Sequence, residues 1–233
     1  LPAAGVARVK SLSNVGRERL GDALAGSLDE GSRLSIISSY FTVFAYGELK
    51  DELSRIDAVR FLFSEPTFIK RMAAEKDPRE FAISQTTRER SVGGAGLELT
   101  LRNNLNQRAI AHECAEWVRT RCEFRSAKMP GVIMPGGTYV VENPNGNDHA
   151  FNGTAADFTL EGLGYERRPN SVMCVSHFEG AAEATGLKLM FQQVWDNPAM
   201  VADVTDEVAA QVETLYRENP PEFVYFLTLY HLF

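Results

Sequence analysis

Hydrophobic and polar positions change their spacing along the N-terminal part of the chain. Leu34–Phe41 is rich in β-forming residues and carries small polar side chains near its end, as strands often do. From Val43 to Ile56 apolar residues recur at helical spacing, and a compact apolar run follows from Ala58 to Phe63. A strand, a helix and a strand in this order predict a right-handed crossover and a parallel strand pair. The pattern is therefore typical of an α/β fold.

The remainder of the chain divides into a mixed part and a helical part. Polar, glycine-rich residues from Lys76 to Gly96 predict a surface loop, and a long helix is expected from Leu97 to Arg121. We expect an α/β body over residues 1–178 and an all-helical C-terminal extension over residues 179–233. Further elements are predicted as strands at Val132–Met134, Thr138–Glu142 and Ser171–Ser176, and as helices at Gly16–Leu28, Glu179–Trp195, Asp203–Glu218 and Pro221–Phe233.

Composition narrows the classes of protein that fit this pattern. The chain has 233 residues and a formal net charge of −7, which argues against a freestanding nucleic-acid-binding protein. No run reaches the roughly 18 apolar residues that span a membrane, so no membrane association is expected. Cys114, Cys122 and Cys174 lack Cys-x-x-Cys spacing, which predicts neither a disulfide framework nor a zinc ribbon and favours a reducing cytoplasm.

A cationic stretch covers the end of the long predicted helix and the residues just beyond it. Its side chains are Arg119, Arg121, Arg125 and Lys128. Cations near a helix C-terminus suit the helix dipole, so a solvated helix end explains them. A patch that faces phosphate groups is the alternative.

The segment from Thr138 to Gly164 carries the most informative local order. A strand is followed by a turn at Pro144 and Asn145-Gly146, because Asn and Gly tolerate positive φ, and then by a second strand. A loop of small residues from Gly153 to Thr159 then opens a predicted helix. This order resembles the second half of the phospholipase-D-like motif, in which His-x-Lys on a strand precedes a hairpin and Gly-Ser-x-Asn-Phe-Thr. In that superfamily the His attacks phosphorus, while the Lys and Asn hold the non-bridging oxygens.

The chain departs from that motif at the positions that carry its chemistry. Aligning Tyr139 with the residue after the family's Lys puts Pro135 at the His position and Gly137 at the Lys position. Asp157 falls at the Asn position, where a carboxylate would repel a phosphodiester. The resemblance therefore implies an inherited fold, a mixed β-sheet flanked by helices, that has lost its catalytic groups.

A broader resemblance covers most of the chain. The matching segments are Leu97–Leu105, Glu113–Val118, Phe151–Gly153, Asn170–Met173, Val204–Val208 and Glu218–Tyr230. Together they resemble the N-terminal region of large bacterial Swi/Snf-type superfamily II DNA/RNA helicases, in which a degenerate phospholipase-D-like domain and a helical segment precede an ATP-dependent motor. The resemblance implies a piece excised from a longer protein, whose partners are the rest of its own helicase chain and DNA or RNA. Gly93–Gly96 lacks the Lys-Ser/Thr of a phosphate loop, so ATP and Mg²⁺ are expected only in the motor.

The remaining candidate side chains are few. His112 and Glu116 share a helix face without a third ligand, so no metal is expected. His149, at the end of the turn, is the candidate for a displaced nucleophile. Polarity at a hairpin end is the favoured explanation, because His149 has no partnered Lys at the motif spacing. A retained anion-binding groove would use backbone donors at the predicted helix N-terminus. Its candidate residues are Arg102, Asn152, Thr154, Thr159 and Asn170.

Three functions remain open at this point. The first is a non-catalytic accessory domain that positions a helicase motor on nucleic acid or on a protein partner. The second is a divergent phosphodiesterase or nuclease that forms a homodimer and builds one site from both Gly153 loops, as single-motif members of the superfamily do. The third is an interaction or dimerisation domain without a nucleic-acid role, which fits the acidic charge.

Overall fold

A mixed β-sheet organises the described part of the chain. The computed structural model describes residues 8–13, 18–67, 104–131, 133, 137–166, 173–180 and 182–214. Eight strands within these residues lie in the order β1-β7-β6-β5-β2-β3-β4-β8. The strands are β1 (Arg8–Ser13), β2 (Arg33–Ser38), β3 (Ala58–Phe63), β4 (Cys122–Ala127), β5 (Gly137–Glu142), β6 (His149–Thr154), β7 (Cys174–Glu179) and β8 (Val201–Asp203). The helices are α1 (Leu20–Ala25), α2 (Val43–Leu53), α5 (Asn104–Arg121), α6 (Ala182–Trp195) and α7 (Thr205–Thr214).

The centre of the sheet is parallel and its flanks are antiparallel. Strand β3 pairs in parallel with both β2 and β4, so the predicted strand pair across α2 is confirmed. Strand β5 turns back antiparallel to β2, and β6, β7 and β1 continue in antiparallel pairs. The predicted α/β class, a mixed sheet flanked by helices, is confirmed.

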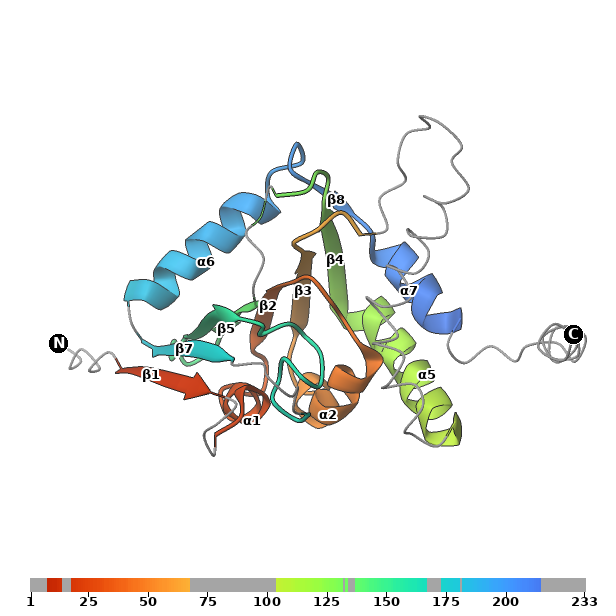
Figure 1. The fold of residues 1–233 in the computed structure, drawn as a ribbon, viewed down its shortest axis with the longest axis horizontal. Helices are drawn as coiled ribbons and strands as arrows, with labels where there is room; N and C mark the ends of the chain where they lie inside the picture. The colour runs from red at the N-terminus through yellow and green to blue at the C-terminus, as the bar shows by residue number, and fades with distance from the viewer. Residues whose placement is uncertain are drawn as a thin grey trace, which may run out of the picture.

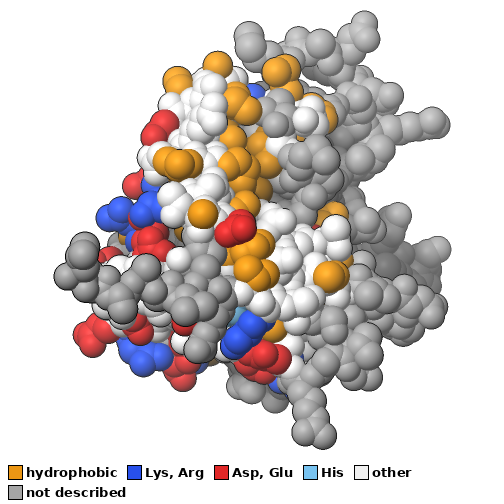
Figure 2. Space-filling model, turned by 90° about the vertical axis from the view of Figure 1, so that its left-hand side faces the viewer, with side chains coloured by type: hydrophobic (Ala, Val, Ile, Leu, Met, Phe, Trp, Pro, Cys, Tyr) orange, Lys and Arg blue, Asp and Glu red, His pale blue; other side chains and the backbone are white. Residues whose placement is uncertain are grey.

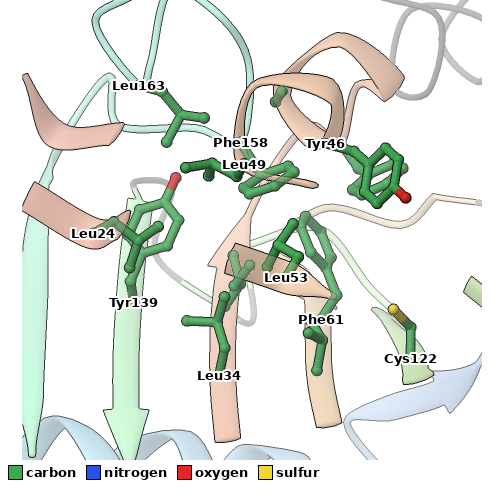
Figure 3. Close-up of a cluster of buried hydrophobic side chains, with 14 of the residues drawn as sticks. Leu24, Leu34, Tyr46, Leu49, Leu53, Phe61, Cys122, Tyr139, Phe158 and Leu163 are labelled. Atoms are coloured by element: carbon green, nitrogen blue, oxygen red, sulfur yellow. The ribbon is translucent and has the colours of Figure 1, made fainter. Parts of the chain in front are cut away.

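Helices cover both faces of the sheet, which explains why its central strands are apolar on both sides. The larger cluster of buried side chains joins α1, α2, α5 and α7 to one face (Figures 1 and 3). On the other face, Phe191 and Trp195 of α6 pack against Ile37, Leu62 and Ala127. Strand β2 therefore buries five of its six residues.

Helix α2 forms where its sequence supplies both a start and an apolar stripe. Thr42 lies in extended conformation, and its Oγ1 accepts a hydrogen bond from Ala45 N at 3.2 Å, which caps the helix. Leu49 and Leu53 continue the buried stripe. The helix ends at Leu53 rather than at Ile56, because Ser54–Asp57 turns into β3.

The predicted C-terminal extension is not all helical. The three residues of β8 pair antiparallel with β4 at Arg125, Ser126 and Ala127, and α7 packs on α5. The described residues between 179 and 214 thus belong to the same sheet and core as the body. Strand β7 also runs to Glu179, where a helix start was predicted, and Gly180 with φ +58° separates it from α6.

The helix predicted to open at Thr159 is a short series of turns as far as Glu166. Leu163 N bonds to Thr159 O at 2.9 Å, but Tyr165 N already bonds back to Leu160 O at 2.8 Å. Gly164, at φ +84°, ends the turn in the left-handed region that glycine adopts readily. Gly153 and Thr154 belong to β6, so the loop begins only at Ala155.

Several predictions lie outside the described residues. These are the loop at 76–96, the start of the long helix at 97–103, the end of the next-to-last predicted helix at 215–218, the last predicted helix at 221–233, and most of Val132–Met134. Of that last predicted strand, Ile133 is described, and it is buried in the α6 cluster outside any strand. No helix among the described residues is long and apolar enough to cross a membrane.

Candidate functional site

Phosphodiester chemistry would be expected at one edge of the sheet. The carboxyl ends of β2, β3 and β4 meet there, since these strands are parallel. The antiparallel strand β5 begins at the same edge with Gly137, and Gly137 is paired with Gly153 near the end of β6. The edge therefore joins Ser38 of β2 and Gly137 of β5 to the loop at 155–157. We call these positions, with Ser39 after β2 and Ser64 after β3, the serine edge.

Backbone already occupies the space where a side chain of residue 137 would lie. A Cβ built on Gly137 would stand 1.8 Å from Ala156 O and 2.7 Å from Ala156 Cβ. Any side chain at position 137 would therefore collide with the loop, and a lysine would collide first through its own Cβ. The position that aligns with the Lys of the phospholipase-D-like motif is closed by the fold.

Tyr139 holds the loop in this closed position. Its hydroxyl donates to Ala156 O at 2.6 Å, and the ring is fully buried in the larger cluster (Figure 3). Burial raises the pKa of the Tyr139 phenol well above its ordinary value, and the nearby Asp157 charge raises it further. Tyr139 thus stays a hydrogen-bond donor, and it locks Ala156 against Gly137.

Asp157, at the position of the family's Asn, bonds to the protein's own backbone and hydroxyls. Its Oδ1 accepts hydrogen bonds from Ser39 N at 2.8 Å and lies 2.9 Å from Ser38 Oγ. Phe158 N donates to the same Ser38 Oγ at 3.0 Å, and Phe158 forms a parallel bridge with Phe41. The carboxylate therefore fastens the loop after β6 to the end of β2.

The hydroxyl groups of the serine edge are engaged with one another. Ser38 is fully buried, and its single proton is shared between Tyr40 O at 2.8 Å and Asp157 Oδ1. Ser39 Oγ and Ser64 Oγ lie 2.8 Å apart. A serine becomes a nucleophile when an adjacent base removes its proton and a substrate can reach it. The buried Ser38 hydroxyl instead bridges β2 and the loop, so this arrangement stabilises the edge.

His149, the candidate nucleophile, lies away from this edge. It pairs with Val141 at the start of β6, four positions from Gly153 and thus about 13 Å along the strand. Its ring is buried, and its Nδ1 lies 3.1 Å from Nε2 of His177. Position and burial both separate His149 from the serine edge.

The residues predicted for an anion-binding groove are only partly brought together. Asn152 and Thr154 are exposed on one face of β6, and Asn152 Nδ2 donates to Thr138 Oγ1 at 2.8 Å. Thr159 is half-buried, and its Oγ1 accepts from Gly162 N at 3.0 Å. The backbone donors of a helix N-terminus are absent here, because the described segment after Thr159 is a turn. Arg102 and Asn170 lie outside the described residues.

The cationic stretch is committed to contacts within the chain. Arg119 forms an ion pair with Glu213, and Arg121 donates to Ile56 O at 2.9 Å. Strand β4 rather than a helix end carries Arg125, which donates to Trp195 O with its guanidinium 4.4 Å from that ring's centroid. Lys128 Nζ donates to Pro198 O at 2.6 Å. Arg119, Arg125 and Lys128 thus contact the C-terminal segment, and Arg121 contacts the turn before β3. These contacts disfavour a patch for phosphate.

One face of the surface shows the same mixing of charges. In Figure 2, Lys and Arg side chains alternate with Asp and Glu and form no continuous basic stripe. Among the residues that the structure describes, no three His, Cys, Asp or Glu side chains come close enough to hold a metal ion.

Sequence reasoning missed the residues that close the serine edge. One sequence feature could have indicated the contact of Ala156 with Gly137: a glycine at the start of a strand often marks a close approach of backbone. Another could have indicated the serine cluster, since the small polar residues Ser38, Ser39 and Ser64 end two adjacent parallel strands. The partner of His149, His177, had none, because the pairing depends on the register of β6 and β7.

Comparisons with known proteins give structural likenesses and no sequence match. No protein-family model matches the chain, and no curated protein matches it. A phospholipase D family member, Nuc from Salmonella typhimurium, is 12% identical over 84% of this chain and 97% of its own, with a TM-score of 0.44. Phosphatidylserine synthase from Haemophilus influenzae Rd KW20 is 9% identical over 86% of this chain and 40% of its own, with a TM-score of 0.49. NucT from Helicobacter pylori is 10% identical over 80% of this chain and 94% of its own, with a TM-score of 0.40. At these identities and TM-scores the likenesses carry nothing about catalysis, ligands or partners.

Proposed function

We propose that this chain is a non-catalytic accessory domain of a longer, ATP-dependent DNA/RNA helicase. The observation that carries the proposal is the contact of Ala156 O with Gly137, which leaves no room for a phosphate-binding side chain. Asp157 supports it, because its carboxylate is occupied by Ser38 and Ser39. What the domain retains is a rigid, closed scaffold suited to holding a neighbour in place.

The net negative charge of the chain favours direct contact of this domain with a protein rather than with nucleic acid. The net charge is −7, and the cations at the end of α5 and around β4 contact other parts of the chain. A nucleic-acid surface would need several unengaged cations, because phosphate contacts dominate such affinity. We therefore place this domain against the motor or a partner protein in a reducing cytoplasm, where three free cysteines are stable.

Nucleic-acid binding can be measured directly. Fluorescence anisotropy with labelled single-stranded and double-stranded DNA and RNA, at low and at physiological salt, is expected to show no saturable binding to the 233-residue chain. Tight binding that weakens steeply with added salt would instead place nucleic acid on the domain itself.

The helicase context rests on the matching segments of the sequence and has its own experiment. The coding sequence that follows the codon for Phe233 is expected to contain the nucleotide-binding motifs of a superfamily II motor. A stop codon at that point, or an unrelated domain, would contradict the context. The closed serine edge would be unaffected by that outcome, so the two parts of the proposal are tested separately.

A further inference from the structure

Two buried histidines face each other on neighbouring strands at the end of the sheet opposite the serine edge. His149 of β6 and His177 of β7 are 8% and 6% exposed. Nδ1 of His149 lies 3.1 Å from Nε2 of His177, and the His177 ring stacks on Phe151 with centroids 4.2 Å apart. Nothing in the proposed function requires this pair, although two buried imidazoles are costly unless they stay neutral.

The hydrogen bonds define where the protons lie. Asn147 Nδ2 donates to Nε2 of His149 at 3.2 Å, so Nδ1 of His149 carries the proton and donates it to Nε2 of His177. Nδ1 of His177 then carries the second proton, and this atom is buried without a partner in the described part of the chain. A proton added to Nε2 of His177 would confront the N–H of His149 and break the bond between the rings.

Charged groups around the pair come from each strand and loop packed on it. Lys10 of β1 lies opposite His177, and Glu179 of β7 lies opposite His149. Burial lowers the pKa of His149 below 6.5, against the raising effect of Glu179, Asp29 and Asp148 and with a small lowering effect of Lys10. Burial also lowers the pKa of His177, where His149 and Lys10 lower it further and Glu179 and Glu18 raise it.

We propose that the His149–His177 pair is a pH-sensitive latch, which fastens the edge strand β1 when both rings are neutral and releases it when both become protonated. Strand β7 is the one strand of the described chain that pairs with β1, and it carries His177. A positive charge on His177 would stand beside Lys10 across the β1–β7 ladder and beside a second cation on His149. Releasing β1 lets both rings reach water, where their charge is stable.

The direction of the pH effect follows from the lowered pKa values. The released state binds more protons than the closed state, so the closed state is fully favoured above pH 6.5 and loses stability as the pH falls below it. Each proton taken up on release changes the opening equilibrium by about tenfold per pH unit. Two protons at pH 5.5 therefore raise the opening constant by up to about 100-fold over its value at pH 8, and one proton by about tenfold.

Hydrogen exchange of the full chain at pH 8.0, 6.5 and 5.5, corrected for the intrinsic exchange rate, measures this opening. The amides of β1 are expected to show the large increase, while those of α5 do not. His177→Gln keeps an acceptor near the Nε2 position and should reduce the increase at β1 to about tenfold or less. His112→Gln, which removes an exposed histidine of α5, is the matched control and should leave the profile of β1 unchanged.

A second measurement does not depend on the variant folding. In the wild-type chain, NMR titration of the imidazole protons should show His149 and His177 remaining neutral to below pH 6.5, because burial lowers the pKa of both rings. The latch is refuted if both buried rings become protonated at or above pH 6.5. It is equally refuted if β1 opens with the same pH dependence in wild type and in His177→Gln.

Discussion

Replacing Gly137 with alanine is the most direct perturbation of the closed serine edge. The added methyl group would stand 1.8 Å from Ala156 O, whereas ordinary contact begins at 3.4 Å. The loop must therefore retreat by about 1.6 Å, the difference between these two distances. That retreat would stretch the 2.6 Å bond from Tyr139 and pull on the neighbouring Asp157.

The size of the effect follows from the groups that would lose their partners. A buried hydroxyl left without its acceptor costs about 1–3 kcal/mol. Forcing an extra carbon into a packed site adds about 1–3 kcal/mol. We therefore expect Gly137→Ala to lower the free energy of unfolding by about 2–6 kcal/mol, a large part of the roughly 5–15 kcal/mol typical of a domain.

Urea denaturation followed by circular dichroism measures this loss as a shift of the midpoint at constant slope. Gly186→Ala is the matched control, because a methyl group there meets nothing within 4 Å on α6. That variant should be more stable than wild type by roughly 0.5–1 kcal/mol through helix propensity. If Gly137→Ala stays within about 1 kcal/mol of wild type, the loop is not locked on Gly137 and the reasoning fails.

Two further substitutions test neighbouring parts of the account. Asp157→Asn keeps an oxygen acceptor for Ser39 N but loses the charge. Denaturation should therefore show a loss of about 1 kcal/mol in the free energy of unfolding, and a phosphodiesterase assay should show no gain in activity. A loss above roughly 3 kcal/mol would contradict the role of Asp157 as a hydrogen-bond acceptor that fastens the loop. Arg60 bonds to Glu142 and Gln192 at 3.1 Å and lies 5.2 Å from the Phe191 ring centroid. Arg60→Met retains the packing on Phe191 and leaves Glu142 paired with Lys188. It should lower the free energy of unfolding by about 1–2 kcal/mol, against about 3–5 kcal/mol for Arg60→Ala. Equal losses in the two variants would show that packing of the Arg60 side-chain stem contributes little.

Local periodicity was enough to predict the centre of the fold. The β2, α2 and β3 segments are adjacent in sequence, and their apolar spacing changes clearly from strand to helix and back. Strand β4 was missed because α5 runs into it directly: Arg121 ends the helix and Cys122 begins the strand, with no Gly or Pro between them. Its burial alternates at Cys122, Glu123 and Phe124, a strand signal that the preceding helix obscured.

Elements defined by pairing were harder to predict. Strand β8 has three residues, too few for a periodic signal, and exists through its ladder with β4. Strand β1 has two apolar residues in six and depends on β7. The helix expected after Thr159 failed because Gly162 and Gly164 favour turns over a continuing helix.

The candidate site shows the same division. The departures at Pro135, Gly137 and Asp157 could be identified from the motif alone, and they indicated lost chemistry. The residue that occupies the space beside Gly137 could not be identified from the sequence, because Ala156 reaches Gly137 only through the pairing of β5 with β6 and the hydrogen bond from Tyr139.

Phosphodiesterase activity of the wild-type chain tests the central claim most directly. Hydrolysis of bis(p-nitrophenyl) phosphate and of single-stranded DNA should proceed at the rate of buffer alone over the whole range of protein concentration, and His149→Ala should be indistinguishable from wild type. Turnover above buffer that disappears in His149→Ala, or that rises with the square of protein concentration as a shared dimeric site would require, would contradict the claim that Ala156 and Asp157 have closed this site.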